Sequence, residues 1–459
     1  MPRVPGSPEH ATANPDDAAR TRWPALAPFR TRSFRYQWPA DLITAWAQEM
    51  EMLILGWYVL VESNSVAALA LFGALLYVGS WIAPLMGTLG DRLGLRRVLG
   101  AMRLAYALLA AVILGLALAG RLQPSIVLAV AFVAGLIKPS DVGMRTALVS
   151  AAVPPAHLVA AMGITRTTGD SARIGGALAG AGFMAGLGLV GAYVAITGLY
   201  LAGAVLTARS GGRPGGQGVQ GAQGVRGERG EKGADRSMAE PAAAAAPRGE
   251  GIAAHWRDLN EGLQHVWRTP LFRAGMVLAA LVNLCAFPFT NGLMPYIARD
   301  VFHLDQQGLG WLVAGFATGA LVGSLGLGTF GARLPPARTM LVASALWYLC
   351  LLGLALPLSV PVASVLLVAT GLSQSVSMVS LSIILMRHSE LRLRGRVMGA
   401  RMLAVYTLPI GLVLAGVLIP AIGFAGLVAV YGIFGLLMTA AIAWVWRDQL
   451  VRRDAAANA

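Results

Sequence analysis

Charged residues are scarce in this chain of 459 residues, and their scarcity excludes an ordinary soluble protein. They make up 13% of the sequence, whereas hydrophobic residues make up 56%. Soluble domains carry about a quarter of charged residues. A soluble fold could not bury this much apolar surface, so the composition indicates a membrane protein.

Lysine and cysteine are rarer still, and this narrows the possible chemistry. Neither of the two lysines, Lys138 and Lys232, follows a glycine-rich stretch of the kind that binds ATP phosphates. Energy must therefore come from an ion gradient, or the process is passive. The two cysteines, Cys285 and Cys350, lie in apolar segments and indicate no disulfide framework. No His, Cys and Asp residues have the spacing of a metal or nucleophile site, so we expect neither an enzyme nor a cofactor.

Long apolar segments recur along the chain instead. Each is close to the roughly 20 residues that an α-helix needs to cross a bilayer. They predict an all-α membrane protein with twelve transmembrane helices. The predicted spans are 38–60, 66–86, 98–119, 123–145, 158–182, 186–208, 272–297, 308–330, 338–357, 361–386, 396–420 and 423–446.

The formal net charge of +14 is placed in a way that indicates membrane topology and not a nucleic-acid partner. Alternate loops are almost bare of basic residues, with Arg121 and Arg299 as the main exceptions. Basic residues crowd the N-terminal tail, 92–97, 209–273, 333–338, 387–396 and the C-terminal tail. By the positive-inside rule, we expect both termini and the central loop in the cytoplasm, and the helices in a bacterial inner membrane.

Two internal repeats divide the chain into halves. "GTLGDRLGLRRVL" from Gly87 matches "GTFGARLPPARTML" from Gly328, and each follows the second span of its half. "MGITRTTGDSARIGGALAG" from Met162 matches "MGARMLAVYTLPIGLVLAG" from Met398, and each lies in a fifth span. Two matches at nearly the same offset predict two pseudo-symmetric six-helix bundles.

A collagen-like stretch separates the two bundles. Glycine falls at every third residue from Gly218 to Gly233, but there is no proline between Gly215 and Asp235. Without proline this period favours a flexible linker over a triple helix. The predicted parts are an N-terminal tail at 1–35, a bundle at 36–208, the linker at 209–255, a bundle at 256–447 that begins with an interfacial helix, and a tail at 448–459.

The first span carries three acids, which are the strongest functional candidates. At 100° per residue, Glu49 and Glu51 flank the face of Asp41, Gln48 and Met52 on opposite sides. Both glutamates lie near mid-bilayer, where a carboxylate costs roughly 2.5–3.5 kcal/mol. A carboxyl group in a dry site readily binds a proton, so we predict proton coupling by Glu49, Glu51 and Asp41. Asp41 is nearer the surface, where a solvated or gating role is expected; the alternative for the glutamates is an ion pair that only joins helices.

Polar residues in other spans predict a substrate cavity. Charges in the fourth and fifth spans, such as Arg145 and Asp141, either neutralise one another at helical spacing, pair with a first-span acid, or receive an anionic substrate. No acid lies deep in a span of the second half, so we expect that half to recognise the substrate by its shape. The predicted cavity residues are Gln48, Met52, Arg166, Asp170, Arg173, Asn283, Asn291, Gln374 and Tyr406.

These motifs resemble the major facilitator superfamily. The stretch from Gly87 is similar to the signature loop of that family between its second and third spans. "LNEGLQHVWRTPLFR", "MPYIARDVFHLDQQGLGWLVAGFATGALVG" and "LRGRVMGARML" are similar to the branch that contains the enterobactin exporter and related drug efflux proteins. The resemblance implies a monomeric, proton-driven exporter that works by alternating access. It disfavours an importer of the same fold, which is one alternative; a membrane scaffold or sensor that transports nothing is the other.

The resemblance also implies a gate and an interface. The implied gate pairs Asp91 with Arg145 and bonds the start of the eleventh helix near 395–398. The implied gate residues are Gly87, Asp91, Arg92, Gly94, Arg96 and Arg145. Glycines at four-residue spacing let helices approach closely, and they predict packing between the fifth and eighth helices of the two halves, with packing inside each half as the alternative. These glycines are Gly176, Gly180, Gly315, Gly319 and Gly323.

Overall fold

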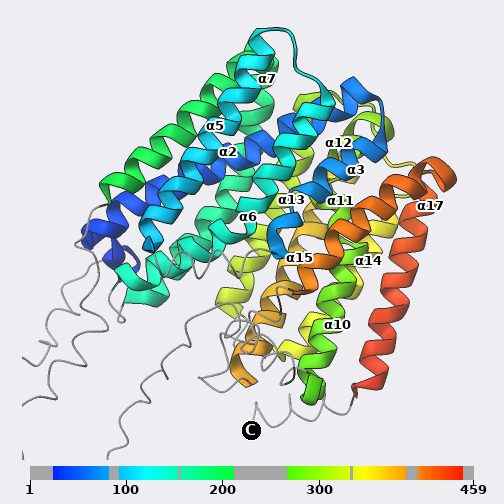
Figure 1. The fold of residues 1–459 in the computed structure, drawn as a ribbon. Coiled ribbons are helices and arrows are strands. Elements are labelled where there is room, and N and C mark those ends of the chain that lie inside the picture. Colours follow the sequence, from blue (N-terminus) through cyan, green and yellow to red (C-terminus); the bar gives the residue numbers. More distant parts are fainter. Residues whose placement is uncertain are drawn as a thin grey trace, which may run out of the picture.

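The computed structural model describes a helical protein made of two groups of helices (Figure 1). The described residues are 24–81, 93–153, 157–210, 264, 267–330, 334–388, 401 and 403–447. After a short 3₁₀ turn, η1 (Pro24–Arg30), the first group contains α2 (Arg32–Ser63), α3 (Val66–Leu75), η2 (Val78–Trp81), α5 (Leu95–Leu118), α6 (Pro124–Ala152) and α7 (Leu158–Arg209). The second contains α10 (Pro270–Cys285), α11 (Phe287–Asn291), α12 (Met294–Tyr296), η4 (Ile297–Val301), α13 (Gln306–Phe330), α14 (Pro336–Gly353), α15 (Val360–His388), η6 (Leu403–Tyr406) and α17 (Thr407–Val445).

Two of these helices each contain two membrane spans. The backbone of α7 leaves helical geometry at Gly188, where φ is 66°, and that of α17 does so at Gly423, where φ is 74°. Glycine adopts such positive φ values without the strain that a side chain would add. The chain reverses direction at each glycine, as α17 shows in Figure 1. With these reversals the described helices follow the predicted spans, so the predicted all-α fold of about twelve helices is confirmed.

The bundle has two ends, which we name by what lies there. At the terminal face α2 begins and α17 ends. At the opposite end, the loop face, α2 ends and both glycine reversals lie (Figure 1). The linker and the predicted helix from 256 lie outside the described residues, except for 264, 267 and 268 at the start of the second group. The exact division of the chain into domains therefore stays a prediction.

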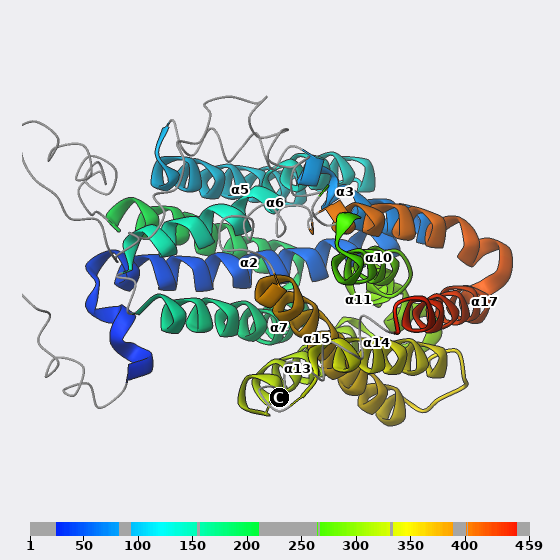
Figure 2. The same ribbon diagram turned by 90° about the horizontal axis from the view of Figure 1, so that it is seen from below.

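The two groups of helices form two halves that meet along a defined set of contacts. Within the first half α7 packs against α2 and α5, and within the second half α15 packs against α13 and α14. Between the halves, α7 lies beside α13 and α3 lies beside α17 (Figures 1 and 2). At the α7–α13 crossing a Cβ on Gly310 would lie 2.5 Å from the Cβ of Ala181, so the helices touch almost at backbone distance there.

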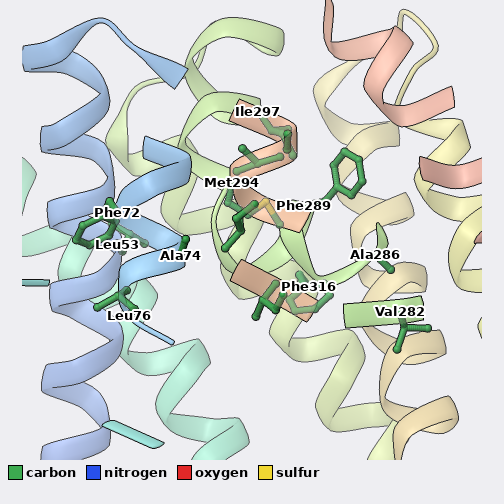
Figure 3. Packing of buried hydrophobic residues seen from close by; sticks show 14 of the residues in the cluster. Leu53, Phe72, Ala74, Leu76, Val282, Ala286, Phe289, Met294, Ile297 and Phe316 are labelled. Atoms are coloured by element: carbon green, nitrogen blue, oxygen red, sulfur yellow. The ribbon is translucent and has the colours of Figure 1, made fainter. Parts of the chain in front are cut away.

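Apolar side chains continue across the boundary between the halves. Leu53 of α2 and Phe72 of α3 belong to the same buried cluster as Met294 of α12, Phe289 of α11 and Phe316 of α13 (Figure 3). These five residues therefore form an apolar seal between the halves, and Leu53 lies one turn past Glu49 toward the end of α2 at the loop face.

Arg299 adds hydrogen bonds between the two halves on the same side of the molecule. This residue of η4 donates from Nη1 to the carbonyl oxygen of Leu60 at 2.9 Å and from Nη2 to Oδ1 of Asn64 at 2.8 Å. Asn64 ends α2 in the left-handed region, with φ of 46°, which turns its side chain amide toward the second half. Asp300 pairs with the same guanidinium at 3.0 Å. The halves are thus joined at the loop face by both apolar and polar contacts.

The glycines that were expected to pack between the halves pack inside each half instead. A Cβ on Gly176 would lie 2.7 Å from the Cβ of Glu49, and one on Gly180 would lie 3.1 Å from the Cα of Met50. Both neighbours belong to α2 of the same half. These glycines bring α7 against α2, so the expectation of an interface role is wrong for them.

The second set of glycines shows the same arrangement. A Cβ on Gly319 would lie 1.9 Å from the carbonyl oxygen of Val368, and one on Gly323 would lie 2.7 Å from that of Leu372. The Cβ of a residue in place of Gly315 would lie 3.7 Å from Val368. Both neighbours belong to α15, so these glycines join α13 to α15 within the second half.

This packing predicts different effects for two glycines of the same helix. Gly319→Ala should destabilise the protein by about 1–3 kcal/mol, because the added methyl group overlaps the backbone of α15. Gly326→Ala should be neutral or stabilising, because nothing lies within 4 Å of its Cβ position and alanine favours a helix by about 1 kcal/mol. Thermal unfolding in detergent measures both, and equal melting temperatures for the two variants would contradict the packing described here.

Candidate functional site

A cavity of about 600 Å³ lies between the two halves. It is lined by α2, α6 and α7 on one side and by α10, α13, α15 and η6 on the other. Near the terminal face it reaches Met162 of α7 and Arg401, and deeper in the bundle it reaches Glu49 and Asn291. Its volume lies within the roughly 300–1,000 Å³ typical of small-molecule sites.

The cavity wall is both apolar and charged. Met52, Phe287 and Met378 supply large apolar surfaces. The charged side chains come mostly from the first half. They are Glu49, Lys138, Arg145, Asp170, Arg173 and Arg401. Charges at this depth are expensive in a membrane unless they face a polar cavity, so their arrangement defines the candidate site.

Glu49 faces the cavity from α2. Its Oε1 lies 3.9 Å from Nε of Arg173 on α7, and the two side chains are 25% and 33% exposed. Gly176, one turn further along α7, has no side chain and lets the two helices approach closely enough for this pair. An ion pair at this distance and exposure is weakly held. Glu49 can therefore exchange Arg173 for another partner at little cost.

Glu51 faces a different compartment, although it lies only two residues further along α2. The hydroxyl of Tyr200 donates a hydrogen bond of 2.7 Å to its Oε2. Glu51 lines a small pocket of about 30 Å³ inside the first half, together with Tyr106 and Lys138. The rings of Tyr106 and Tyr200 stack at 5.5 Å between centroids. The helical geometry expected for the two glutamates, on opposite sides of one face, agrees with this placement.

Asp41 is not the solvated residue that we expected. It is 4% exposed and forms an ion pair with Arg103 of α5, which is fully buried and also donates to the hydroxyl of Thr207. Gln37 donates a further hydrogen bond of 2.7 Å to Asp41. The expectation of a solvated residue was wrong because it considered the first span alone, whereas the expected gating role stays a prediction. The signal in the sequence was a single arginine near the start of the apolar run 98–119.

Arg145 pairs within its own helix. It bonds Asp141 one turn before it on α6, and its Nη2 also donates to Oε1 of Gln48 at 3.2 Å. Gln48 in turn donates to Oδ2 of Asp141 at 3.4 Å. This arrangement corresponds to the alternative in which these charges neutralise one another. It does not test the implied pairing of Arg145 with Asp91, because Asp91 lies outside the described residues.

The other implied gate residues are only partly described. Gly87 and Arg92 lie outside the described residues, as does the segment near 395–398. Gly94 precedes α5 with φ of 89°, a conformation that favours glycine. Arg96 lies in the first turn of α5. The gate therefore stays a prediction.

The remaining predicted cavity residues mostly line the cavity. Asp170 does so and accepts a hydrogen bond of 3.3 Å from Ser324 of α13, across the boundary between the halves. Asn283, Asn291 and Gln374 line the cavity from the second half. Tyr406 is not among the lining residues, and the side chain of Arg166 lies outside the described residues.

Several cavity residues were not singled out from the sequence. Tyr77, Met378 and Arg401 line the cavity, as does Lys138, which had been considered only as a possible ligand of ATP phosphates. Ser375 also lines it, next to Gln374. The Oγ of Ser375 and the Oε1 of Gln374 are buried without a hydrogen-bond partner among the described residues. These two atoms are therefore available to a bound molecule.

The Asp41–Arg103 pair predicts a stability effect. Asp41→Asn should destabilise the protein by about 3–5 kcal/mol, because it leaves the Arg103 charge buried without its partner. The double variant Asp41→Asn, Arg103→Gln should lose much less than the sum of the two single variants, since it leaves no buried charge. Thermal unfolding of the three variants measures the coupling, and simple additivity would contradict a buried ion pair.

Comparisons with known proteins give a fold and a family match over part of the chain. The model of the Major Facilitator Superfamily matches residues 276–458. The multidrug efflux pump Tap of Mycobacterium tuberculosis (strain ATCC 25618 / H37Rv) is 30% identical over 187 residues, which cover 40% of this chain and 42% of the pump. Tap of Mycobacterium bovis (strain BCG / Pasteur 1173P2) matches to the same extent. The match thus spans less than half the length of these relatives.

Solved structures match over nearly the whole chain. The nucleoside transporter NupG has a TM-score of 0.66 at 12% identity, covering 90% of this chain and 99% of that one. A bacterial homologue of the human lysosomal transporter Spinster, solved in an inward-facing and unoccupied conformation, has a TM-score of 0.63 at 13% identity, covering 93% and 98%. The family model thus matches the C-terminal half of the chain, and the solved structures share the fold of the described helices.

Proposed function

We propose that this protein is a secondary active exporter that exchanges protons for a small amphipathic organic molecule, a drug or a siderophore, by alternating access. The observation that carries the proposal is the cavity of about 600 Å³ between two halves, with the carboxylate of Glu49 in its wall. A site at the interface of two repeats, near the middle of the membrane, is typical of secondary transporters.

The contacts around the cavity support alternating access. The cavity extends from the middle of the bundle toward the terminal face, whereas apolar residues and the bonds of Arg299 to Leu60 and Asn64 hold the loop face together. Opening toward the loop face would break those two hydrogen bonds and separate the apolar seal. We interpret the structure as one of two states that differ by rocking of the halves.

The distribution of arginines supports an orientation. The described basic residues at the loop face are Arg121 and Arg299. Many more lie at the terminal face: Arg30, Arg32, Arg35, Arg96, Arg97, Arg209, Arg268, Arg338 and Arg447. By the positive-inside rule, the terminal face is cytoplasmic, in the inner membrane of a bacterium. The cavity then extends toward the cytoplasm, where an exporter collects its substrate.

The cavity wall fits an amphipathic substrate. Met52, Phe287 and Met378 can contact apolar surface, while Asn283 and Gln374 can exchange hydrogen bonds with polar groups. A wall of this kind tolerates molecules of different shape, since methionine side chains adapt easily. The name multidrug efflux pump, carried by the Tap relatives, supports export over import. Substrate movement into or out of inside-out vesicles decides between the exporter and an importer of the same fold.

The central prediction concerns the two glutamates. Glu49→Gln and Glu51→Gln, tested singly, should abolish proton-driven efflux in at least one case, because an amide cannot take up and release the coupling proton. Both variants should still be inserted in the membrane, since the change keeps size and hydrogen bonding. The measurement is proton-driven transport of a fluorescent drug such as ethidium in proteoliposomes with an imposed pH gradient.

Glu62→Gln provides the matched control. Glu62 lies on the same helix but is exposed near the loop face, so its loss should leave transport unchanged. If both Glu49→Gln and Glu51→Gln pump as fast as this control, the carboxylates do not couple protons and the proposal is wrong. Loss of transport in all three variants would point to a general defect of α2 instead.

A further inference from the structure

Lys138 is a half-buried cation without a carboxylate partner among the described residues. It is the only lysine among the described residues. Its Nζ lies 4.0 Å from Sδ of Met52 and 6.0 Å from the ring centroid of Tyr77, and it forms no ion pair within 4.0 Å in the described part of the chain. Two of the arginines in the same cavity wall differ in this respect: Arg145 pairs with Asp141, and Arg173 pairs with Glu49.

Lys138 also lies between the two compartments that hold the two glutamates. It lines the cavity that contains Glu49 and the small pocket that contains Glu51. Gln48 and Met52 line both spaces as well, so Lys138 is the charged member of this shared wall. Glu51 itself does not line the cavity. A side chain at this position can act on both carboxylates, whereas each carboxylate acts in its own compartment.

The backbone near Lys138 is closely packed, whereas the side chain of Lys138 has a long, flexible stem. A Cβ on Gly135 would lie 1.9 Å from the carbonyl oxygen of Leu75, so α6 touches the end of α3 at backbone distance. The four-carbon stem of a lysine, by contrast, rotates freely and carries a compact charge. The geometry allows the ammonium group to move while the helix stays in place.

We propose that Lys138 is a mobile cation shared by Glu51 and Glu49, which transmits the protonation of Glu51 to the substrate cavity. When Glu51 is ionised, it holds the ammonium group in the small pocket. When a proton binds a carboxylate oxygen of Glu51, the ammonium group moves to Glu49. Lys138 keeps its charge throughout, and the only bond made or broken is the O–H bond on Glu51. This inference rests on the proposed exchange of protons for substrate.

The shared cation explains how exchange would arise without contact between proton and substrate. A positively charged group of the substrate, such as a protonated amine, binds Glu49 while Lys138 stays with Glu51. Protonation of Glu51 sends Lys138 to Glu49, and the substrate loses its partner. The pocket of about 30 Å³ has room for water, since one water needs roughly 10–15 Å³. Gln48, Tyr106 and Lys138 provide polar partners for it.

Other charged and titratable groups surround this space and must be considered in any pH response. They are Asp141 and Arg145 on α6, Glu49 and Glu51 on α2, Tyr77 after α3, Tyr106 on α5, and Arg173, Tyr193 and Tyr200 on α7. Asp141 and Arg145 neutralise each other. Arg173 competes with Lys138 for Glu49, so the proposal requires that Lys138 joins this weak pair or replaces it.

The scarcity of lysine makes a direct test possible. In a Lys232→Arg background Lys138 is the only lysine, so nitrogen-15 at the lysine ε position labels one side chain. Solid-state NMR of the full chain in lipid bilayers then measures the dipolar coupling from this nitrogen to carbon-13 in glutamate carboxyl groups. We expect a coupling at alkaline pH that Glu51→Gln removes, and a coupling at acidic pH that Glu49→Gln removes. Glu62→Gln should change neither coupling.

Two results would overturn the proposal. One is that the same glutamate substitution removes the coupling at both pH values, which would make Lys138 a static partner. The other is that no coupling appears at either pH. Both results are independent of transport, so they separate this proposal from the proposed function. Proton-driven efflux without a pH-dependent coupling would contradict the shared cation alone. A pH-dependent coupling without proton-driven efflux would contradict the exporter.

Transport assays provide a second arm. Lys138→Met should abolish accumulation of ethidium against its gradient while downhill movement continues, because Glu51 then no longer acts on Glu49. Lys138→Arg should keep part of the uphill transport, since it keeps the charge on a long side chain. Arg121→Met, which removes an exposed charge at the loop face, is the control and should transport normally. Normal uphill transport by Lys138→Met would contradict the proposal.

Discussion

A carboxylate inside a membrane span must be paired, hydrogen-bonded or hydrated, and this constraint organises the first half of the protein. Asp41 is paired with Arg103 in a buried site, and Asp141 is paired with Arg145 on its own helix. Glu51 is hydrogen-bonded by Tyr200, whereas Glu49 has a long contact with Arg173 beside a wide cavity. The acids thus differ in how firmly they are held. The two glutamates are held less firmly than Asp41 and Asp141, since neither forms a close ion pair among the described residues.

The fold depends on a second constraint, which is the close approach of helices that surround a space. Glycines bring α7 against α2 and α13 against α15, so each half is tightly packed. Between the halves the contacts are concentrated at the loop face and along α7–α13 and α3–α17. Two compact halves with localised contacts can rock as units. The cavity and its carboxylates lie where that motion would change access.

The membrane-spanning helices and part of the candidate site could be predicted from the sequence. Apolar runs of membrane length predicted the spans, and the reversals at Gly188 and Gly423 lie close to the predicted breaks between them. Helical geometry placed Glu49 and Glu51 on opposite sides of one face. It could not find Arg103, which reaches Asp41 from a helix 62 residues away. Nor could glycine spacing show which neighbour approaches: that depends on the tertiary arrangement of α2 and α15.

The central claim is that protonation of carboxyl groups on α2 rocks the two halves about the cavity. Spin labels at Glu62 and Asp305 report on the loop face, and labels at Arg97 and Arg338 report on the terminal face; all four positions are exposed. Electron–electron distance measurements in lipid bilayers, at alkaline and acidic pH, compare the two faces. The account predicts that one pair of distances lengthens as the other shortens, and that Glu49→Gln or Glu51→Gln holds one arrangement at both pH values. Distances that do not change with pH, or that change in the same direction at both faces, would contradict it.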